Sequence, residues 1–161
     1  VYGGGETGCE TAELAAAEGW RVHLVTRSPA RQLARSAEFV YRRTLLARVQ
    51  SHPRIAIHAE TRLVSVTDGR ADIEGKDGAR QKLQVGQVLL AQGRRPADAL
   101  SGAMRAAGIA HAVIGDARRG GRIGEAVNDA WDAVRALALA GPEEARLMPG
   151  SGPSPSPHAI P

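Results

Sequence analysis

The chain opens on a glycine pattern, Gly3-x-Gly5-x-x-Gly8, that is typical of the turn between a strand and a helix in a dinucleotide-binding unit. The first glycine allows a tight turn, the second lets the backbone approach a pyrophosphate, and the third lets the helix pack closely on the strand. Amides at the helix N-terminus then bind the phosphates, and Thr7 is placed to contact the nucleotide. In a chain with 19 glycines, an ordinary loop is the alternative.

The segments after these glycines have the order that a Rossmann unit requires. Small apolar residues from Thr7 to Glu18 predict a helix with a face that packs closely on a sheet, and Gly19 is expected to end it. The apolar, β-branched run from Arg21 to Thr26 predicts the next strand. Strand, turn, helix and strand in this order favour dinucleotide-type geometry over an accidental loop.

The strand that should precede the glycines is short. A Rossmann unit needs about five residues of buried strand there, and only Val1 and Tyr2 precede Gly3. We therefore interpret the chain as a piece of a longer protein. Because the central strand of the sheet is incomplete, we expect poor stability of the chain in isolation.

The remaining segments predict an α/β fold, in which a parallel Rossmann-type sheet carries an antiparallel three-stranded meander. From residue 61 the apolar period changes from that of helices to two, with Asp68-Gly69 and Lys76-Asp77-Gly78 as turns. The predicted helices cover residues 36–50, 99–107 and 122–140, and the predicted strands cover 54–58, the meander from 61 to 84, the doubly buried run 85–91, and 111–114. Residues 149–161 are rich in Pro, Ser and Gly and predict a disordered tail.

Composition bounds the partners and the setting. The net charge of +4 comes mainly from scattered arginines with few aromatic residues among them, which favours a solvated surface and no nucleic acid partner. The single cysteine, Cys9, excludes an intrachain disulfide and a redox-active pair; we expect a buried packing thiol and a cytoplasmic setting. We find no apolar run that predicts a membrane span. The histidines lack metal-binding spacing, and Trp20 and Trp131 are expected to pack against the protein rather than to stack on an aromatic cofactor.

The end of the second strand bears on nucleotide choice. An Asp or Glu about twenty residues after the glycines would hold the ribose of NAD, but Thr26-Arg27-Ser28 stands there instead. An Arg pairs well with a 2′-phosphate and Ser adds a hydrogen bond, so NADPH is favoured over NADH. The alternative, a solvated Arg27 and an unbound adenosine, stays open, because phosphate recognition usually needs a second basic group; Arg31 is the nearest.

Three segments in order resemble one enzyme family. GGGETGCETAELAAAEG, VLLAQGRRP and VIGDARRGGRIGEAVNDAWDAVRAL are similar to the C-terminal flavoprotein portion of the 2,4-dienoyl-CoA reductase and trimethylamine dehydrogenase family, which is old-yellow-enzyme-like. The resemblance covers residues 1 to about 140. It implies an NAD(P)H-type dinucleotide domain at 1–98, a returning segment of an FAD-type domain at 99–140, and a tail at 141–161.

The resemblance also implies cofactors, partners and a function. The chain would be part of an FAD- and FMN-dependent NAD(P)H oxidoreductase, inactive by itself, and its partner would be the rest of its own polypeptide, with an FMN barrel and a 4Fe-4S cluster. Self-association into a homo-oligomer is left open. The runner-up is a non-catalytic nucleotide-binding or vestigial scaffold domain, and for Asp116 a turn or helix cap is the alternative to a flavin contact. Expected cofactor contacts are Gly3, Gly5, Thr7, Gly8, Thr26, Arg27, Ser28, Gly93, Gly115 and Asp116.

Overall fold

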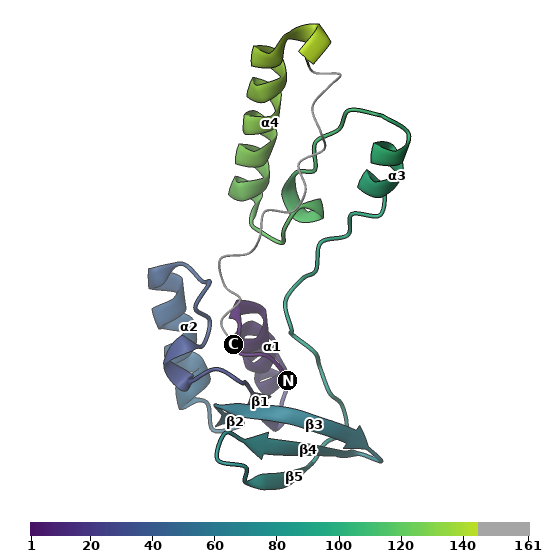
Figure 1. The fold of residues 1–161 in the computed structure, drawn as a ribbon. Helices are drawn as coiled ribbons and strands as arrows, with labels where there is room; N and C mark the ends of the chain where they lie inside the picture. Colours follow the sequence, from purple (N-terminus) through teal and green to yellow (C-terminus); the bar gives the residue numbers. More distant parts are fainter. Residues whose placement is uncertain (145–161) are drawn as a thin grey trace. The chain divides into compact units, whose positions relative to one another are not determined.

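The structure is a computed structural model that describes residues 1–144 (Figure 1). The chain divides after Gly93 into two compact units, and each unit is described by itself. The first unit contains α1 (Glu6–Ala17), β1 (Val22–Val25), the 3-10 turn η1 (Ala30–Gln32), α2 (Phe39–Ser51), β2 (Ile55–His58), β3 (Thr61–Thr67), β4 (Arg70–Gly75) and β5 (Arg80–Gln84). The second contains α3 (Ser101–Ala106), η2 (Gly115–Ala117) and α4 (Ile123–Glu144).

The parallel part of the first unit is built around β1. Strand β2 pairs with β1 in parallel, from Val22 opposite Ile55 to Val25 opposite His58. On its other side, Val25 forms a parallel bridge with Tyr2, and Tyr2 forms a second parallel bridge with Leu90. The order across the sheet is therefore β2, β1, the segment at Tyr2, and the segment at Leu90, which is the parallel arrangement that the sequence predicts.

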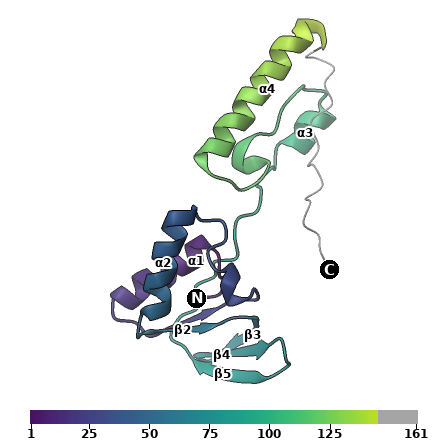
Figure 2. The ribbon, with the colours of Figure 1, turned by 90° about the vertical axis from the view of Figure 1, so that its left-hand side faces the viewer.

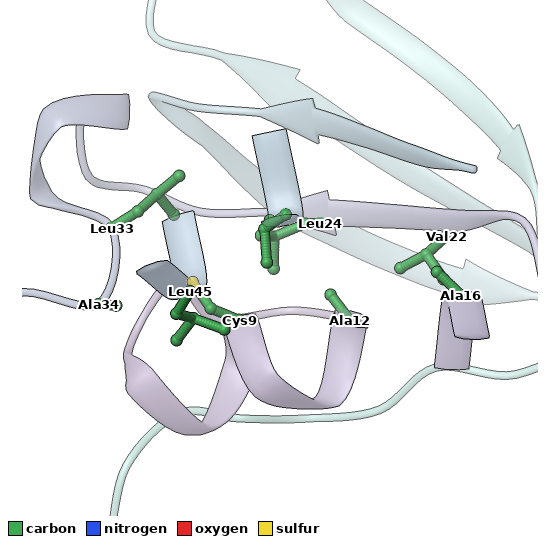
Figure 3. Packing of buried hydrophobic residues seen from close by; sticks show 9 residues of the cluster. Cys9, Ala12, Ala16, Val22, Leu24, Leu33, Ala34 and Leu45 are labelled. Atoms are coloured by element: carbon green, nitrogen blue, oxygen red, sulfur yellow. The ribbon is translucent and has the colours of Figure 1, made fainter. Parts of the chain in front are cut away.

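Helices α1 and α2 cover one face of β1 and β2 (Figures 1 and 2). Cys9, Ala12 and Ala16 lie one or two turns apart on α1 and are all buried. Leu24 points from β1 into the helix layer, close to Cys9 and Ala12 (Figure 3). The small residues of α1 let the backbone of this helix approach β1, and larger side chains, such as Leu45 and Val49 of α2, fill the space between the two helices. The same cluster also contains Val22, Leu33 and Ala34.

The meander β3–β4–β5 is antiparallel throughout, as predicted. Asp68 and Gly69 both have positive φ, 48° and 72°, the conformation that a two-residue hairpin turn requires. Ala71 and Ile73 of β4 alternate inward and join Val25 and Leu83 in a second small core. The meander therefore packs against β1 through side chains.

Unit two is held mainly by polar contacts in its described residues. Helix α3 begins where Asp98 accepts a hydrogen bond from the Ser101 amide at 3.1 Å. Helix α4 carries an apolar stripe at helical spacing that remains exposed: Ile123, Val127, Trp131 and Val134. The sequence predicts this face correctly, but the described residues leave it uncovered.

Several expectations are wrong in detail. The run 85–91 makes only the bridge at Leu90, and Leu89 and Leu90 are 43% and 69% exposed, because the two residues of the neighbouring strand offer little to pair with. Residues 111–114 form no strand, since no strand lies beside them in the described part of their unit. Trp20 and Trp131 are 61% and 65% exposed rather than packed. Helix α4 extends to Glu144 rather than ending near 140, and the predicted tail at 149–161 lies outside the described residues.

Candidate dinucleotide site

The three patterned glycines occupy three different environments. Gly3 has φ of +132°, and a Cβ built there would lie 2.1 Å from the carbonyl oxygen of Ala91. A Cβ on Gly8 would lie 1.9 Å from the carbonyl oxygen of Gly3. A Cβ on Gly5, in contrast, would meet nothing within 4 Å. Gly3 and Gly8 thus allow the turn and the close packing of α1, whereas the backbone at Gly5 is open to an approaching group.

Helix α1 begins directly at this loop. Gly5 is its N-cap, and no side chain caps the helix. The amide of Cys9 donates to the Gly5 carbonyl at 3.0 Å, so the first-turn amides before it point out of the helix end. Thr7 lies exposed in this turn. This is the geometry that binds a phosphate group through backbone amides and the helix dipole.

Cys9 sits just behind the loop and is fully buried. Burial raises the pKa of its thiol to about 11. The thiol therefore stays protonated at neutral pH and packs as a small apolar group. The structure confirms the prediction of a packing cysteine.

Thr26 is buried beneath the loop and fixes its position. Its amide donates to the carbonyl of His58 at 2.9 Å and its carbonyl accepts from the amide of Thr61 at 2.8 Å. Its side chain lies against Gly4, where a Cβ would come within 2.5 Å of the Thr26 Oγ1. The same hydroxyl accepts from the Ser28 amide at 3.2 Å. Thr26 is thus placed to support the loop, while Arg27 is exposed.

Gly4 is a site residue that the sequence pattern missed. Beyond its contact with Thr26, its carbonyl accepts a hydrogen bond from the amide of Ala34 at 2.8 Å. This bond ties the loop after β1 to the glycine loop. The run of three consecutive glycines was the available signal, since the spacing rule explains only two of them.

A cavity of about 340 Å³ lies beside η1, and three arginines, Arg31, Arg35 and Arg42, make its lining basic. The guanidinium group of Arg42 donates to the carbonyls of Leu33 at 2.9 Å and Arg31 at 2.6 Å, so it holds the loop. Arg31 and Arg35 are exposed at the cavity, and Phe39 offers an exposed ring beside them. Arg31, the second basic group that the sequence suggested, thus shares a cavity with Arg35, whereas Arg27 is not among the residues that line it.

The second unit contains the other two predicted contacts. Gly115 has φ of +58° and donates its amide to Asp129 Oδ2 at 3.1 Å. The carboxylate of Asp116 accepts from Arg94 Nη1 at 2.9 Å and from the Gly121 amide at 3.1 Å. Both oxygens of Asp116 are therefore engaged within the unit.

Asp129, which the sequence did not single out, pairs with Arg118. The hydrogen bond from Arg118 is the main reason why the pKa of Asp129 is lowered. The hydrogen bond from the Gly115 amide lowers it as well. The pair orients the turn at Gly115. Gly93 ends the first unit with φ of +85° and open space around it.

The predicted cofactor contacts are divided between the two units. Gly115 and Asp116 belong to the second unit, and the first unit contains the others: Gly3, Gly5, Thr7, Gly8, Thr26, Arg27, Ser28 and Gly93.

Residues 1–123 match the family model of the pyridine nucleotide-disulphide oxidoreductases. The chain belongs to this family. Its fold is a Rossmann-like FAD/NAD(P)-binding fold, and the family is one of oxidoreductases that use FAD and a pyridine nucleotide. A comparison with curated protein sequences finds no significant match.

Solved structures of this oxidoreductase fold match most of the chain. Histamine dehydrogenase from Rhizobium sp. 4-9 matches with a TM-score of 0.66 and 22% identity over 84% of this chain and 22% of its own. 6-Hydroxypseudooxynicotine amine oxidase from Pseudomonas geniculata N1 matches with a TM-score of 0.67 and 21% identity, over 82% of this chain and 21% of its own. A 2-naphthoyl-CoA reductase complex matches with a TM-score of 0.64 and 21% identity, over 81% of this chain and 19% of its own. The chain therefore spans about a fifth of the length of these proteins, and at such identities the likeness concerns the fold.

Two features are absent from residues 1–144. No helix there is long and apolar enough to cross a membrane. No group of three or more His, Cys, Asp and Glu side chains there is arranged to hold a metal ion.

Proposed function

We propose that the chain supplies the NAD(P)H-binding domain of a larger flavin-dependent oxidoreductase, together with a returning segment of that enzyme's FAD domain. The observation that carries this proposal is the division of roles among the glycines: Gly3 and Gly8 are sterically obligatory, and Gly5 is open. An open backbone position at a helix N-terminus lets a pyrophosphate approach the helix amides. Family membership supplies the oxidoreductase class.

In this proposal residues 1–98 form the dinucleotide domain and residues 99–140 the returning FAD-type segment. The bound nicotinamide would supply a hydride to a flavin, or accept one from it. Residues of this chain would bind and orient the dinucleotide, with the α1 amides at the pyrophosphate. The FMN barrel and 4Fe-4S cluster of related flavoproteins would belong to other parts of the polypeptide, which would also be the main partner of this chain.

We further propose a preference for NADPH. Arg27 and Ser28 follow β1, where a carboxylate would select NADH, and Arg31 and Arg35 line the basic cavity beyond η1. Arg42 donates to two backbone carbonyls, whereas Arg27, Arg31 and Arg35 are exposed. Guanidinium groups bind phosphate with good geometry and full charge.

The test is a titration of the full-length flavoprotein with NADPH and NADH, followed through flavin absorbance and by calorimetry. We expect tighter binding of NADPH, and in Arg27→Ala a loss of about tenfold or more for NADPH with little change for NADH. Arg43→Ala, an exposed arginine of α2, serves as the charge-matched control. Equal failure of both nucleotides, with flavin retained, would reject the proposal.

A non-catalytic scaffold role is the second candidate, and one observation favours it. Each carboxylate oxygen of Asp116 already accepts one hydrogen bond, from Arg94 or from the Gly121 amide, so this residue has a structural role within the protein itself. A scaffold domain would keep this arrangement permanently. In the oxidoreductase, a flavin hydroxyl would replace one of these partners, and flavin loading would be weaker in Asp116→Asn than in the parent protein.

A further inference from the structure

The segment between β1 and α2 carries exposed arginines on a backbone with little regular structure. Arg27, Arg31 and Arg35 are exposed, and η1 is the one regular element of this segment, all of which the structure describes. A loop of this kind loses conformational freedom when it binds a ligand, and that loss weakens binding. Contacts that fix the loop beforehand therefore raise its affinity for the ligand.

Arg42 fixes this loop from the start of α2. Its Nε donates to the carbonyl of Leu33 at 2.9 Å, and its Nη2 donates to the carbonyl of Arg31 at 2.6 Å. These two carbonyls lie at the end of η1, where backbone oxygens take donors from outside the helix. Both bonds use a charged donor, which makes them stronger than bonds between neutral groups. One planar guanidinium thus holds two residues of the loop, and one of them is Arg31.

The same loop is tied to the glycine loop on its other side. The Ala34 amide donates to the Gly4 carbonyl at 2.8 Å, and a Cβ on Gly4 would lie 2.9 Å from Cδ2 of the buried Leu33. Ala34 is fully buried and has a φ of +48°, a left-handed backbone that alanine seldom adopts. Such a conformation persists only where neighbouring contacts impose it. The bond from Arg42 to Leu33, directly before Ala34, is one of these contacts.

We propose that Arg42 is a positioning residue for nucleotide choice, which fixes the loop backbone so that Arg31 and Arg35 meet the 2′-phosphate of NADPH. The inference rests on the proposed NADPH preference and adds a residue on which that preference depends. The bond from Ala34 to Gly4 sets the position of these arginines relative to the pyrophosphate-binding loop. Arg42 therefore acts on the phosphate through the backbone and not by contact.

Direct contact of Arg42 with the phosphate is the competing role, because Arg42 also lines the cavity. A guanidinium binds a phosphate best through two adjacent nitrogens. In Arg42 the adjacent pair Nε and Nη2 is already bonded to the two carbonyls. Substitution by lysine separates the two roles, because an ammonium replaces a phosphate ligand as a point charge but cannot reproduce a planar fork across two carbonyls.

The test is a double-mutant cycle in the full-length flavoprotein, with the affinities for NADPH and NADH measured by calorimetry. We expect Arg42→Met to weaken NADPH binding about tenfold and NADH binding less than about threefold. In a protein that also carries Arg31→Ala and Arg35→Ala, the same change should weaken NADPH binding less than about twofold. Arg42→Lys should lose nearly as much as Arg42→Met, and it replaces Arg42→Met in the cycle if that variant does not fold. Arg43→Met, at an exposed position of α2, is the matched control.

Amide hydrogen exchange without nucleotide tests the backbone part of the proposal. Exchange at Leu33 and Ala34 should be at least about tenfold faster in Arg42→Met than in the parent protein. Unchanged exchange there would overturn the proposal. An Arg42→Lys variant with the parent's NADPH preference would also overturn it, as would a loss on Arg42→Met that is equally large without Arg31 and Arg35, since both results assign Arg42 to the phosphate itself. Failure of the proposed function is distinguishable, because it appears in the parent protein as binding of neither nucleotide.

Discussion

At the scale of single residues, Gly5 and Gly8 make a matched pair for testing the loop. A methyl group at Gly8 would collide with the Gly3 carbonyl, whereas one at Gly5 meets open space. We expect Gly8→Ala to lower the free energy of unfolding by about 2 kcal/mol. Gly5→Ala should change it by no more than about 0.5 kcal/mol and yet weaken nucleotide binding. Urea unfolding with nucleotide titration checks both; equal stability losses would show that the loop is merely structural.

Two histidines on neighbouring strands predict a pH effect. His23 Nδ1 and His58 Nε2 lie 3.0 Å apart, and burial lowers the pKa of both below the ordinary 6.5. The charges of the Val1 amine and Arg21 lower the pKa of His23 further. The pKa of His58 is lowered further by His23 and by the Val1 amine. As the pH falls, these histidines bind protons in the unfolded chain at a higher pH than in the folded chain. Their contribution to the free energy of unfolding is therefore fully present above about pH 6.5 and is lost as the pH drops below that value.

Denaturant unfolding between pH 8 and pH 5 measures this effect. Acetylation of Val1 removes the titration of the terminal amine while keeping an N–H donor. His58→Gln should flatten the remaining pH dependence, and an unchanged slope in that variant would contradict the assignment. His52→Gln, on the loop before β2, is the control.

At the scale of elements, α2 is held to the core chiefly by Leu45 and Val49, which are fully buried, whereas its apolar residues Phe39 and Val40 are exposed. We expect Leu45→Ala to cost about 2–5 kcal/mol, because it removes buried surface and leaves a cavity. The exposed neighbour Thr44→Ala should stay within about 0.5 kcal/mol. Thermal or urea unfolding of the two variants gives the comparison, and a small loss at Leu45 would mean that the core refills the space.

The same scale explains what the sequence could and could not predict. Local signals located α1, β1, β2 and the meander, because small-residue faces, β-branched runs and the Asp68-Gly69 turn each carry their own conformational preference. The run at 85–91 has strand composition, but a strand needs neighbours, and the described residues offer it only Tyr2. The packing of Gly4 against Thr26 and the Arg94–Asp116 pair are contacts between distant segments, which no local pattern contains.

At the scale of the whole molecule, the division into two compact units predicts weak cooperativity. Within the first unit, the described parallel pairing is limited to β1 with β2 and to the isolated bridges of Tyr2 with Val25 and Leu90. We expect the chain to unfold over a broad range with a low midpoint in calorimetry. A sharp transition whose calorimetric and van't Hoff enthalpies agree would contradict this expectation.

Thr26 has a mechanical consequence for the molecule. Its main chain is bonded to His58 at the end of β2 and to Thr61 at the start of the meander, and its side chain lies under Gly4. One residue thus joins three strands to the loop that precedes α1. A displacement of the meander would therefore be transmitted through Thr26 to the backbone at Gly4, which couples the meander mechanically to the glycine loop.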